Sequence, residues 1–157
     1  MSTDTPLRLH DYLPYRLALA SHRVSRMVGR AYRARFGLSI PEWRVIAILG
    51  EDGEATAQGL GDAAGLDKVS VSRAVRALVD RGLVEKRPHG RDKRSSLLRL
   101  TADGEAVYAD VAPAALEAEA ALLAGLSDEE AQLLAALLDW VRARAQSLLD
   151  KTAAPAD

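Results

Sequence analysis

The sequence contains no cysteine, and this absence excludes several kinds of chemistry at once. Disulfide bonds, zinc fingers, thiol catalysis and cysteine-based redox sensing all need at least one thiol. Aromatic residues are also scarce, at 4% of the 157 residues, which disfavours a lectin-like or aromatic-lined sandwich. We therefore expect a helical protein that is rich in alanine and leucine.

Long apolar runs are absent as well. No run approaches the roughly 18 residues that are needed to cross a bilayer. Residues 1–13 lack the apolar segment of a signal peptide. Apolar residues nevertheless make up 48% of the chain, enough for the core of one domain with an oligomerisation arm. These features predict a soluble, cytoplasmic protein without a membrane partner.

Motifs of known enzymes are missing or incomplete. The chain has no G-x-S-x-G, no P-loop and no H-E-x-x-H. Residues 59–64 match the loose dinucleotide pattern G-x-G-x-x-A, but we expect neither the preceding strand nor the βαβ unit that this pattern requires. His10 and His89 have no partners at metal-ligand spacing. We therefore expect neither an enzyme nor a bound cofactor or metal.

Charge is distributed unevenly along the chain. Residues 66–100 contain ten Lys and Arg against four Asp and Glu, a net charge of +6. Residues 101–157 contain three basic against eleven acidic residues, a net charge of −8. A basic centre followed by an acidic tail suggests that one part of the protein meets a polyanion. A solvated basic face is the alternative, and charge alone does not decide between them.

Helical periodicity dominates the first half. Apolar residues recur at intervals of three and four in four stretches. The expected helices cover residues 7–36, 41 to about 53, 56–64 and 67–82. Thr56 can cap the third helix, either Asp67 or Ser70 can open the fourth, and Gly82 closes it.

After Gly82 the period changes to that of β-strands. Two short strands are expected over residues 83–87 and 96–100. The loop between them, residues 88–95, is polar and carries several cations. The fold class predicted is therefore mainly α with a small β-hairpin wing.

Two further helices are expected after the hairpin. One begins at Thr101, and Pro113 is expected to bend or interrupt it. Ser127 and Glu130 form a capping box that opens the other, which is rich in leucine. Because one small lobe cannot cover so apolar a helix, it favours a dimer interface.

Helix, glycine turn, helix and basic hairpin is the order of a winged helix-turn-helix. With Val71, Ala74, Val75 and Leu78 turned inward, the serines and arginines of the fourth helix face outward. Arginine can pair with guanine in the major groove, and cations at a hairpin tip suit phosphates or a narrow minor groove. The predicted DNA contacts are Lys68, Ser70, Ser72, Arg73, Arg76, Arg91, Lys93 and Arg94.

Asp92 cannot attract DNA, and we expect it to pair with Arg94 or a neighbour and hold the hairpin tip in one shape. A winged helix used only for protein contacts remains the alternative to DNA binding. That function would require an apolar outer face on the fourth helix, which the serines and arginines there disfavour.

These residues resemble the MarR family of bacterial transcriptional regulators. The resemblance rests on residues 67–75, on Asp92 and Arg94 in the hairpin, and on the Leu-Thr-x-x-Gly of residues 100–104. It implies one protomer over residues 1–157, with a DNA-binding lobe at 38–100 and a helical dimerisation region at 7–36 and 101–150. A homodimer of this kind reads a pseudo-palindromic operator.

Members of the family usually release DNA when a small molecule, often an aromatic acid, enters a crevice beside the lobe. The resemblance therefore implies a repressor that responds to an aromatic acid or to its CoA thioester. The corresponding lining here is Tyr15, Arg16, His22, Arg23, Arg26, Trp43 and Arg44, and the CoA phosphates would meet Arg30, Arg33 and Arg35. Trp43 is more often a core residue than a ligand wall, and Tyr15, His22 and Arg26 also fit a surface or dimer interface.

Overall fold

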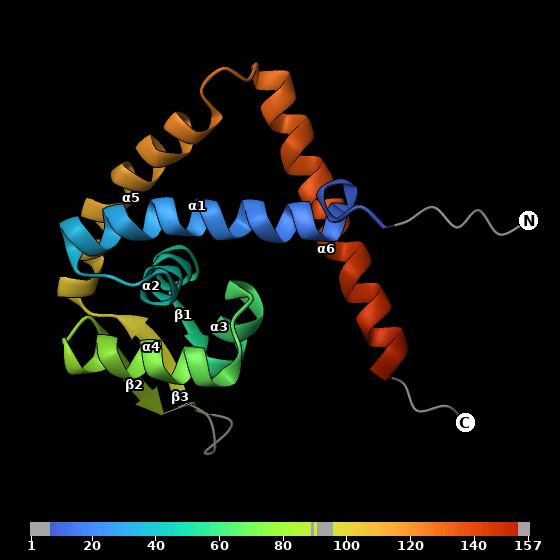
Figure 1. Cartoon of the computed structure of the whole chain (residues 1–157). Coiled ribbons are helices and arrows are strands. Elements are labelled where there is room, and N and C mark those ends of the chain that lie inside the picture. Colours follow the sequence, from blue (N-terminus) through green and yellow to red (C-terminus); the bar gives the residue numbers. More distant parts are fainter. Residues whose placement is uncertain (1–6, 89, 91–95, 154–157) are drawn as a thin grey trace, which may run out of the picture. The chain divides into compact units, whose positions relative to one another are not determined.

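The computed structural model describes residues 7–88, 90 and 96–153. The chain divides into two compact units, Met1–Leu116 and Glu117–Asp157. The first unit holds a long helix, a bundle of three shorter helices and a small sheet (Figure 1). The second consists of the end of one helix and the whole of the last one.

The N-terminal helix starts later than its periodicity suggests. A short 3-10 turn, η1 (Leu9–Asp11), precedes α1 (Leu13–Phe36), so the predicted single helix from residue 7 is wrong at its start. Pro14 lies in the first turn of α1, where its missing N–H costs nothing, whereas inside a longer helix its ring would meet the preceding turn. Gly37 ends α1 in the left-handed conformation (φ 63°), as predicted.

Three helices then form the helix-turn-helix, and their starts follow capping chemistry. They are α2 (Ile40–Asp52), α3 (Ala57–Ala64) and α4 (Lys68–Asp80). The Ser39 hydroxyl accepts from the Glu42 amide at 3.3 Å, and the Thr56 hydroxyl accepts from the Gly59 amide at 3.1 Å. Asp67, rather than Ser70, caps α4. These caps fix the helices at the bounds that the sequence predicts to within a few residues.

A three-stranded antiparallel sheet completes the lobe. Its strands are β1 (Glu54–Thr56), β2 (Val84–Pro88) and β3 (Ser96–Leu100), in the order β1-β3-β2. The expected hairpin pairs in register from Val84 opposite Leu100 to Pro88 opposite Ser96. Strand β1 was not predicted, because three residues are too few to show an alternating pattern.

The core of the first unit lies between α2, α3, α4 and the sheet. All four residues of α4 that were predicted to face inward are buried, and Leu78 has no exposed surface. The largest fully buried side chains are Leu38, Val45, Ile46, Leu49, Leu60, Leu78, Val84, Leu98 and Val111. This packing holds α4 with one face inward and the other in solvent.

Helix α5 (Ala102–Leu123) follows the sheet and crosses from the first unit into the second. It runs without interruption through Pro113, so of the two expectations there, a bend or an interruption, the interruption is wrong. Proline removes one hydrogen bond, and the burial of Val111 and Ala114 on either side keeps this stretch of helix against the core. At its start, the Thr101 hydroxyl accepts from the Gly104 amide at 3.1 Å.

Helix α6 (Asp128–Ala153) begins at the predicted capping box. The Ser127 amide donates to the Glu130 carboxylate at 2.8 Å, and the Glu130 amide donates to the Ser127 hydroxyl at 3.2 Å. None of its described residues is buried. Its exposed large apolar residues are Leu133, Leu134, Leu137, Leu138, Trp140, Leu148 and Leu149. Over the described ranges, no helix has the length and hydropathy that a membrane crossing demands.

Candidate nucleic-acid interface

The start of α4 is held by one carboxylate. Asp67 accepts the Ser70 amide at 2.8 Å and the Ser70 hydroxyl at 2.9 Å. Hydrogen bonds from the Ser70 amide and hydroxyl hold the pKa of Asp67 below its ordinary value. The Ser70 side chain, one of the predicted DNA contacts, is thus half-buried and already engaged in the helix cap.

The outer face of α4 is polar and cationic. Lys68, Ser72, Arg73 and Arg76 are all exposed, while the opposite face of the same helix is buried. The structure therefore brings these four predicted contacts onto one solvent-facing side. Val69, which the sequence analysis did not single out, is exposed on the same helix.

A pocket of about 710 Å³ lies between this helix, α3 and the sheet. Lys68 and Ser72 contribute to its lining from α4, Gln58 from α3, and Lys86 from β2. Asp62 is the acidic residue of this lining. Gln58 and Lys86 were not predicted as site residues; the strand position of Lys86 beside the basic loop was the available signal.

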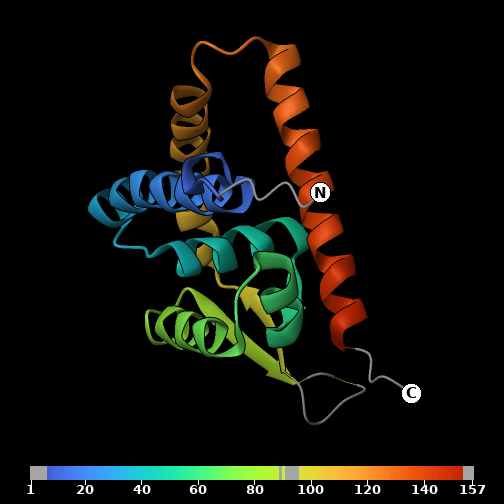
Figure 2. The same ribbon diagram turned by 45° about the vertical axis from the view of Figure 1, so that its right-hand side comes forward.

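The hairpin strands β2 and β3 lie beside α4 at one end of the lobe (Figure 1, Figure 2). Glu85 pairs across the strands with Arg99 and along its own strand with Arg87, the latter at 3.2 Å. The hydrogen bond from Arg99 is the main cause that lowers the pKa of Glu85. The predicted wing residues Arg91, Asp92, Lys93 and Arg94 lie outside the described residues.

Two arginines connect the helices of the lobe. Arg81, after α4, donates to the Gly37 carbonyl at 3.1 Å and lies 3.9 Å from the Glu42 carboxylate. Arg44 donates from α2 to the Ala64 carbonyl at the end of α3, at 3.1 Å. The predicted ligand residue Arg44 thus makes a contact within the helix-turn-helix.

Trp43 lies in an aromatic cluster, stacked on Tyr108 and tilted against Tyr32. Its ring centroid is 5.5 Å from that of Tyr32 on α1 and 6.1 Å from that of Tyr108 on α5. The side chain packs against the hydrophobic core, and burial raises the pKa of the neighbouring Tyr32. Trp43 thus packs against the core, and its role as a ligand wall stays a prediction.

The other predicted effector residues lie along α1. A pocket of about 370 Å³ is lined by His10, Tyr15, Arg16, Leu19, Ala20 and Arg23. Tyr15, Arg16 and Arg23 are therefore brought together, whereas His22 and Arg26 are exposed and do not line this pocket. Arg30 and Arg33 are exposed, and the Arg35 guanidinium lies 5.4 Å from the centre of the Phe36 ring.

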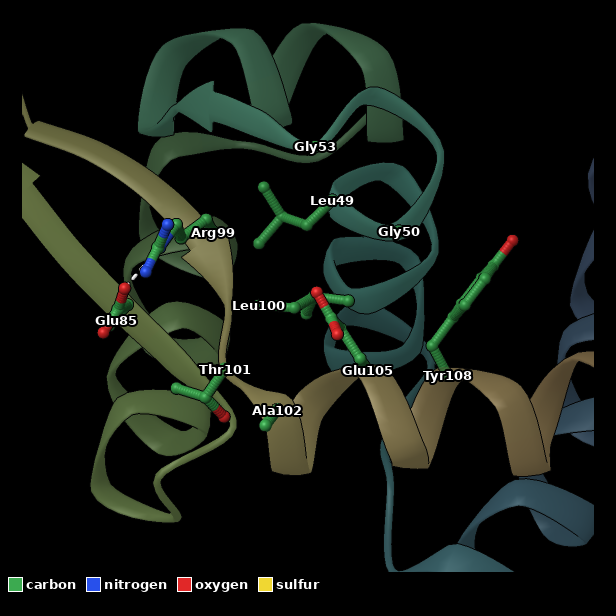
Figure 3. A pocket seen from close by; sticks show the side chains of 10 residues that line it. All are labelled: Leu49, Gly50, Gly53, Glu85, Arg99, Leu100, Thr101, Ala102, Glu105 and Tyr108. Atoms are coloured by element: carbon green, nitrogen blue, oxygen red, sulfur yellow. Dashed lines mark hydrogen bonds and ion pairs between the residues drawn. The ribbon is translucent and has the colours of Figure 1, made fainter.

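A third pocket, of about 570 Å³, joins the end of α2, the sheet and the start of α5 (Figure 3). Glu85 and Arg99 form an ion pair on the strands at one side of it, while Glu105 and Tyr108 project from α5. None of the predicted DNA or effector residues lines it. Among the described residues, no three His, Asp or Glu side chains gather as metal ligands would.

The dinucleotide-like motif needs a correction. A strand, β1, does precede residues 59–64, although none was expected there. It is three residues long and antiparallel to β3, and α3 begins at Ala57, so the motif lies inside the helix. A dinucleotide loop needs its glycines between strand and helix in a parallel βαβ unit, so this arrangement does not supply one.

Comparison with known proteins agrees with this architecture. Residues 36–95 match the model of the MarR family. YwoH of Bacillus subtilis, an uncharacterized HTH-type transcriptional regulator, is 32% identical over 95 residues, which are 60% of this chain and 69% of that protein.

Two solved structures extend the likeness over most of the chain. A MarR/EmrR family transcriptional regulator from Acinetobacter sp. ADP1 has a TM-score of 0.83 at 28% identity, covering 90% of this chain and 99% of that one. Bordetella bronchiseptica BpsR, whose DNA binding is regulated by 6-hydroxynicotinic acid, has a TM-score of 0.80 at 21% identity. The aligned region covers 87% of this chain and 97% of the BpsR chain. At this level of identity the likeness concerns the fold alone.

Proposed function

Because this chain belongs to the MarR family of transcriptional regulators, we propose that it acts as a homodimer that binds a pseudo-palindromic DNA operator. The observation that carries the proposal is the two-sided character of α4. Its inner face is buried in the core, and its outer face exposes Lys68, Ser72, Arg73 and Arg76. Such a helix can enter the major groove while the rest of the lobe holds its orientation.

Charge supports the same function. The segment 66–100 has a net charge of +6, and its basic strand residues Lys86 and Arg87 are exposed beside α4. In the proposed complex, Arg73 and Arg76 approach base edges, and Arg91, Lys93 and Arg94 of the wing bind phosphates or the minor groove. We expect Asp92 to pair with Arg94 in that complex and to hold the wing tip in one shape.

We assign dimerisation to the helices of residues 7–36 and 101–150. The leucines of α6 supply an apolar surface that this unit does not bury. A two-fold dimer would place its two recognition helices in successive major grooves, about 34–36 Å apart. The acidic character of residues 101–157 suits a region that stays away from phosphate.

We propose that the protein is a repressor and that its effector is an aromatic acid or the CoA thioester of such an acid. The pocket on α1 combines the Tyr15 ring with the cations Arg16 and Arg23, a set suited to a flat anion. BpsR, of the same fold, responds to such an acid. Ligand binding would favour a lobe spacing that no longer fits DNA, with a coupling of about 1–3 kcal/mol.

A winged-helix module for protein contacts is the second candidate. It would need an apolar outer face on α4, and only Val69 among the exposed residues of that face is apolar. We assign the chain no enzymatic activity, since the relatives above are transcriptional regulators.

Fluorescence anisotropy with the DNA upstream of the protein's own gene tests the proposal. We expect nanomolar binding, with log K falling steeply as log salt rises, because cations on the lobe displace condensed counterions. A scrambled duplex of the same length is the control for sequence preference. If neither duplex binds at low salt, the DNA-binding function is wrong and the protein-contact module replaces it.

The effector is tested on the same complex with benzoate, 6-hydroxynicotinate and benzoyl-CoA. We expect one of these to release DNA and Arg23→Ala to lose this response while DNA affinity without ligand stays unchanged. Arg142→Ala, an exposed arginine of α6, is the matched control. An undiminished response in Arg23→Ala would move the effector site away from the α1 pocket.

A further inference from the structure

Val69 is an exception to the burial pattern of the helices and strands from α2 to β3. Its side chain is 65% exposed at the second position of α4. Of the described large apolar residues between positions 28 and 115, it is the only exposed one. Single exposed apolar side chains are common on protein surfaces, so Val69 gains meaning only from a structural reason or from its position on the helix.

The local structure of α4 gives no such reason. An apolar pair can fix a helix start when the residue before the cap packs against the fourth helical residue. In α4 these positions belong to Leu66 and Val71, which line the same pocket and are half-buried and buried. Valine is also a poorer helix former than alanine, so propensity does not favour it at position 69.

The position of Val69 on the helix points to DNA. Residues three, four and seven positions apart share one helical face, and from position 69 these are Ser72, Arg73 and Arg76. All three are exposed. Val69 thus lies on the stripe that is proposed to face the major groove, near the N-terminal end, where recognition helices contact base edges.

We propose that Val69 reads the C5-methyl group of a thymine in each half of the operator. This inference rests on the proposed DNA-binding function. In the major groove, thymine is marked by a methyl group, and an apolar side chain is the partner that such a group prefers. The neighbouring Ser72 and Arg73 recognise bases by hydrogen bonds and cannot detect a methyl group in this way.

The test replaces single thymines with uracil, which lacks only the methyl group. The operator is first selected from random duplexes with the wild-type protein, and each thymine is then exchanged in both half-sites. At one position we expect uracil to weaken wild-type binding by about fourfold per half-site, the effect of one buried methyl group. Val69→Ala should bind the thymine and uracil duplexes with equal affinity.

Lys68→Ala is the matched control, because Lys68 is the neighbour of Val69 and its cation is expected to contact phosphate. It should weaken binding to both duplexes and leave their ratio as in the wild type. Circular dichroism checks that both variants keep their helix content.

The outcomes separate the two proposals. A wild-type protein that binds no duplex contradicts the DNA-binding function itself. Tight operator binding that is insensitive to uracil at every position contradicts only the methyl contact. A uracil effect that persists undiminished in Val69→Ala assigns the methyl contact to another residue and overturns the role of Val69.

Discussion

The two compact units of this chain differ in what they bury. The first has a continuous core in which Leu38, Ile46 and Leu78 have no exposed surface, whereas α6 in the second has no buried residue among those described. Their charges differ too, with a net charge of +6 over residues 66–100 of the first unit and of −5 over residues 117–157, the second unit, which contain three basic and eight acidic residues. The helix-turn-helix and sheet of the first unit thus bury their own core and present a basic polar face, whereas the second unit presents leucines that need a partner.

This difference separates two requirements of a DNA regulator. Reading a base demands a helix that is fixed from behind, and the buried face of α4 supplies that support. Pairing two copies demands an apolar surface that the protomer leaves open. The experiments below test whether the two units can be disabled separately.

The largest effect is expected from disabling the second unit. The double variant Leu134→Asp/Leu138→Asp introduces charge on one face of α6 and should give a monomer by analytical ultracentrifugation. Operator affinity should fall about 100-fold or more, because two linked half-site contacts become independent. The control is Gln132→Asp/Gln146→Asp, at exposed polar positions of the same helix. A leucine double variant that stays dimeric would place the interface elsewhere.

The core of the first unit is tested at Gly104. A Cβ added there would lie 2.0 Å from the carbonyl oxygen of Leu83, so α5 would have to move away from the sheet. We expect Gly104→Ala to lower the free energy of unfolding by about 3 kcal/mol in urea titrations. Gly59→Ala, where the nearest atom lies at 3.4 Å, should be neutral or stabilising. Equal stability of the two variants would contradict the tight packing of α5 on the lobe.

The outer face of α4 is tested with Arg73→Ala. If Arg73 reads a base, the variant should lose about 1–3 kcal/mol on the operator and little on scrambled DNA. Arg94→Ala in the wing should instead weaken binding to both duplexes and reduce the salt slope by about one. A uniform loss in Arg73→Ala would reassign Arg73 to phosphate.

The smallest effect concerns pH. The carboxyl groups of Asp67 and Glu85 have pKa values below their ordinary 3.8 and 4.5, because of hydrogen bonds from Ser70 and Arg99 respectively. As pH falls, the unfolded chain therefore binds protons at these two carboxyl groups before the folded chain does. The stabilisation that the ionised groups give the fold is thus present above their ordinary pKa values and is lost below them. Thermal melts between pH 7 and pH 3 should show this loss, and Asp67→Asn, which keeps a cap, should reduce it. Identical pH profiles for both proteins would contradict the role of this cap.

Much of the fold could be predicted from the sequence because its signals are local. Capping residues such as Thr56 and Asp67, and the apolar spacing in α4, fix helix bounds and faces without distant information. The features that were missed depend on tertiary contacts. The strand β1 exists only by pairing with β3, and α5 continues through Pro113 where the flanking residues pack in the core.

The candidate site shows the same division. Helical spacing alone predicted that Ser70, Ser72, Arg73 and Arg76 face outward; the last three are exposed, whereas Ser70 is half-buried in the cap. The same spacing could have identified Val69 as an exposed neighbour. The ring partners of Trp43 come from α1 and α5, far away in the chain, so its place in an aromatic cluster could not be predicted from neighbouring residues.

The number of chains bound per operator tests most directly whether the first unit binds DNA while the second unit pairs two copies of the chain. The mass of the complex with the selected operator is measured by light scattering, and affinities are compared for the operator and for a duplex with one half-site scrambled. We predict two chains per operator and binding to the single half-site that is about 100-fold weaker. One chain per duplex, with equal affinity for both, would contradict a dimer that reads two half-sites.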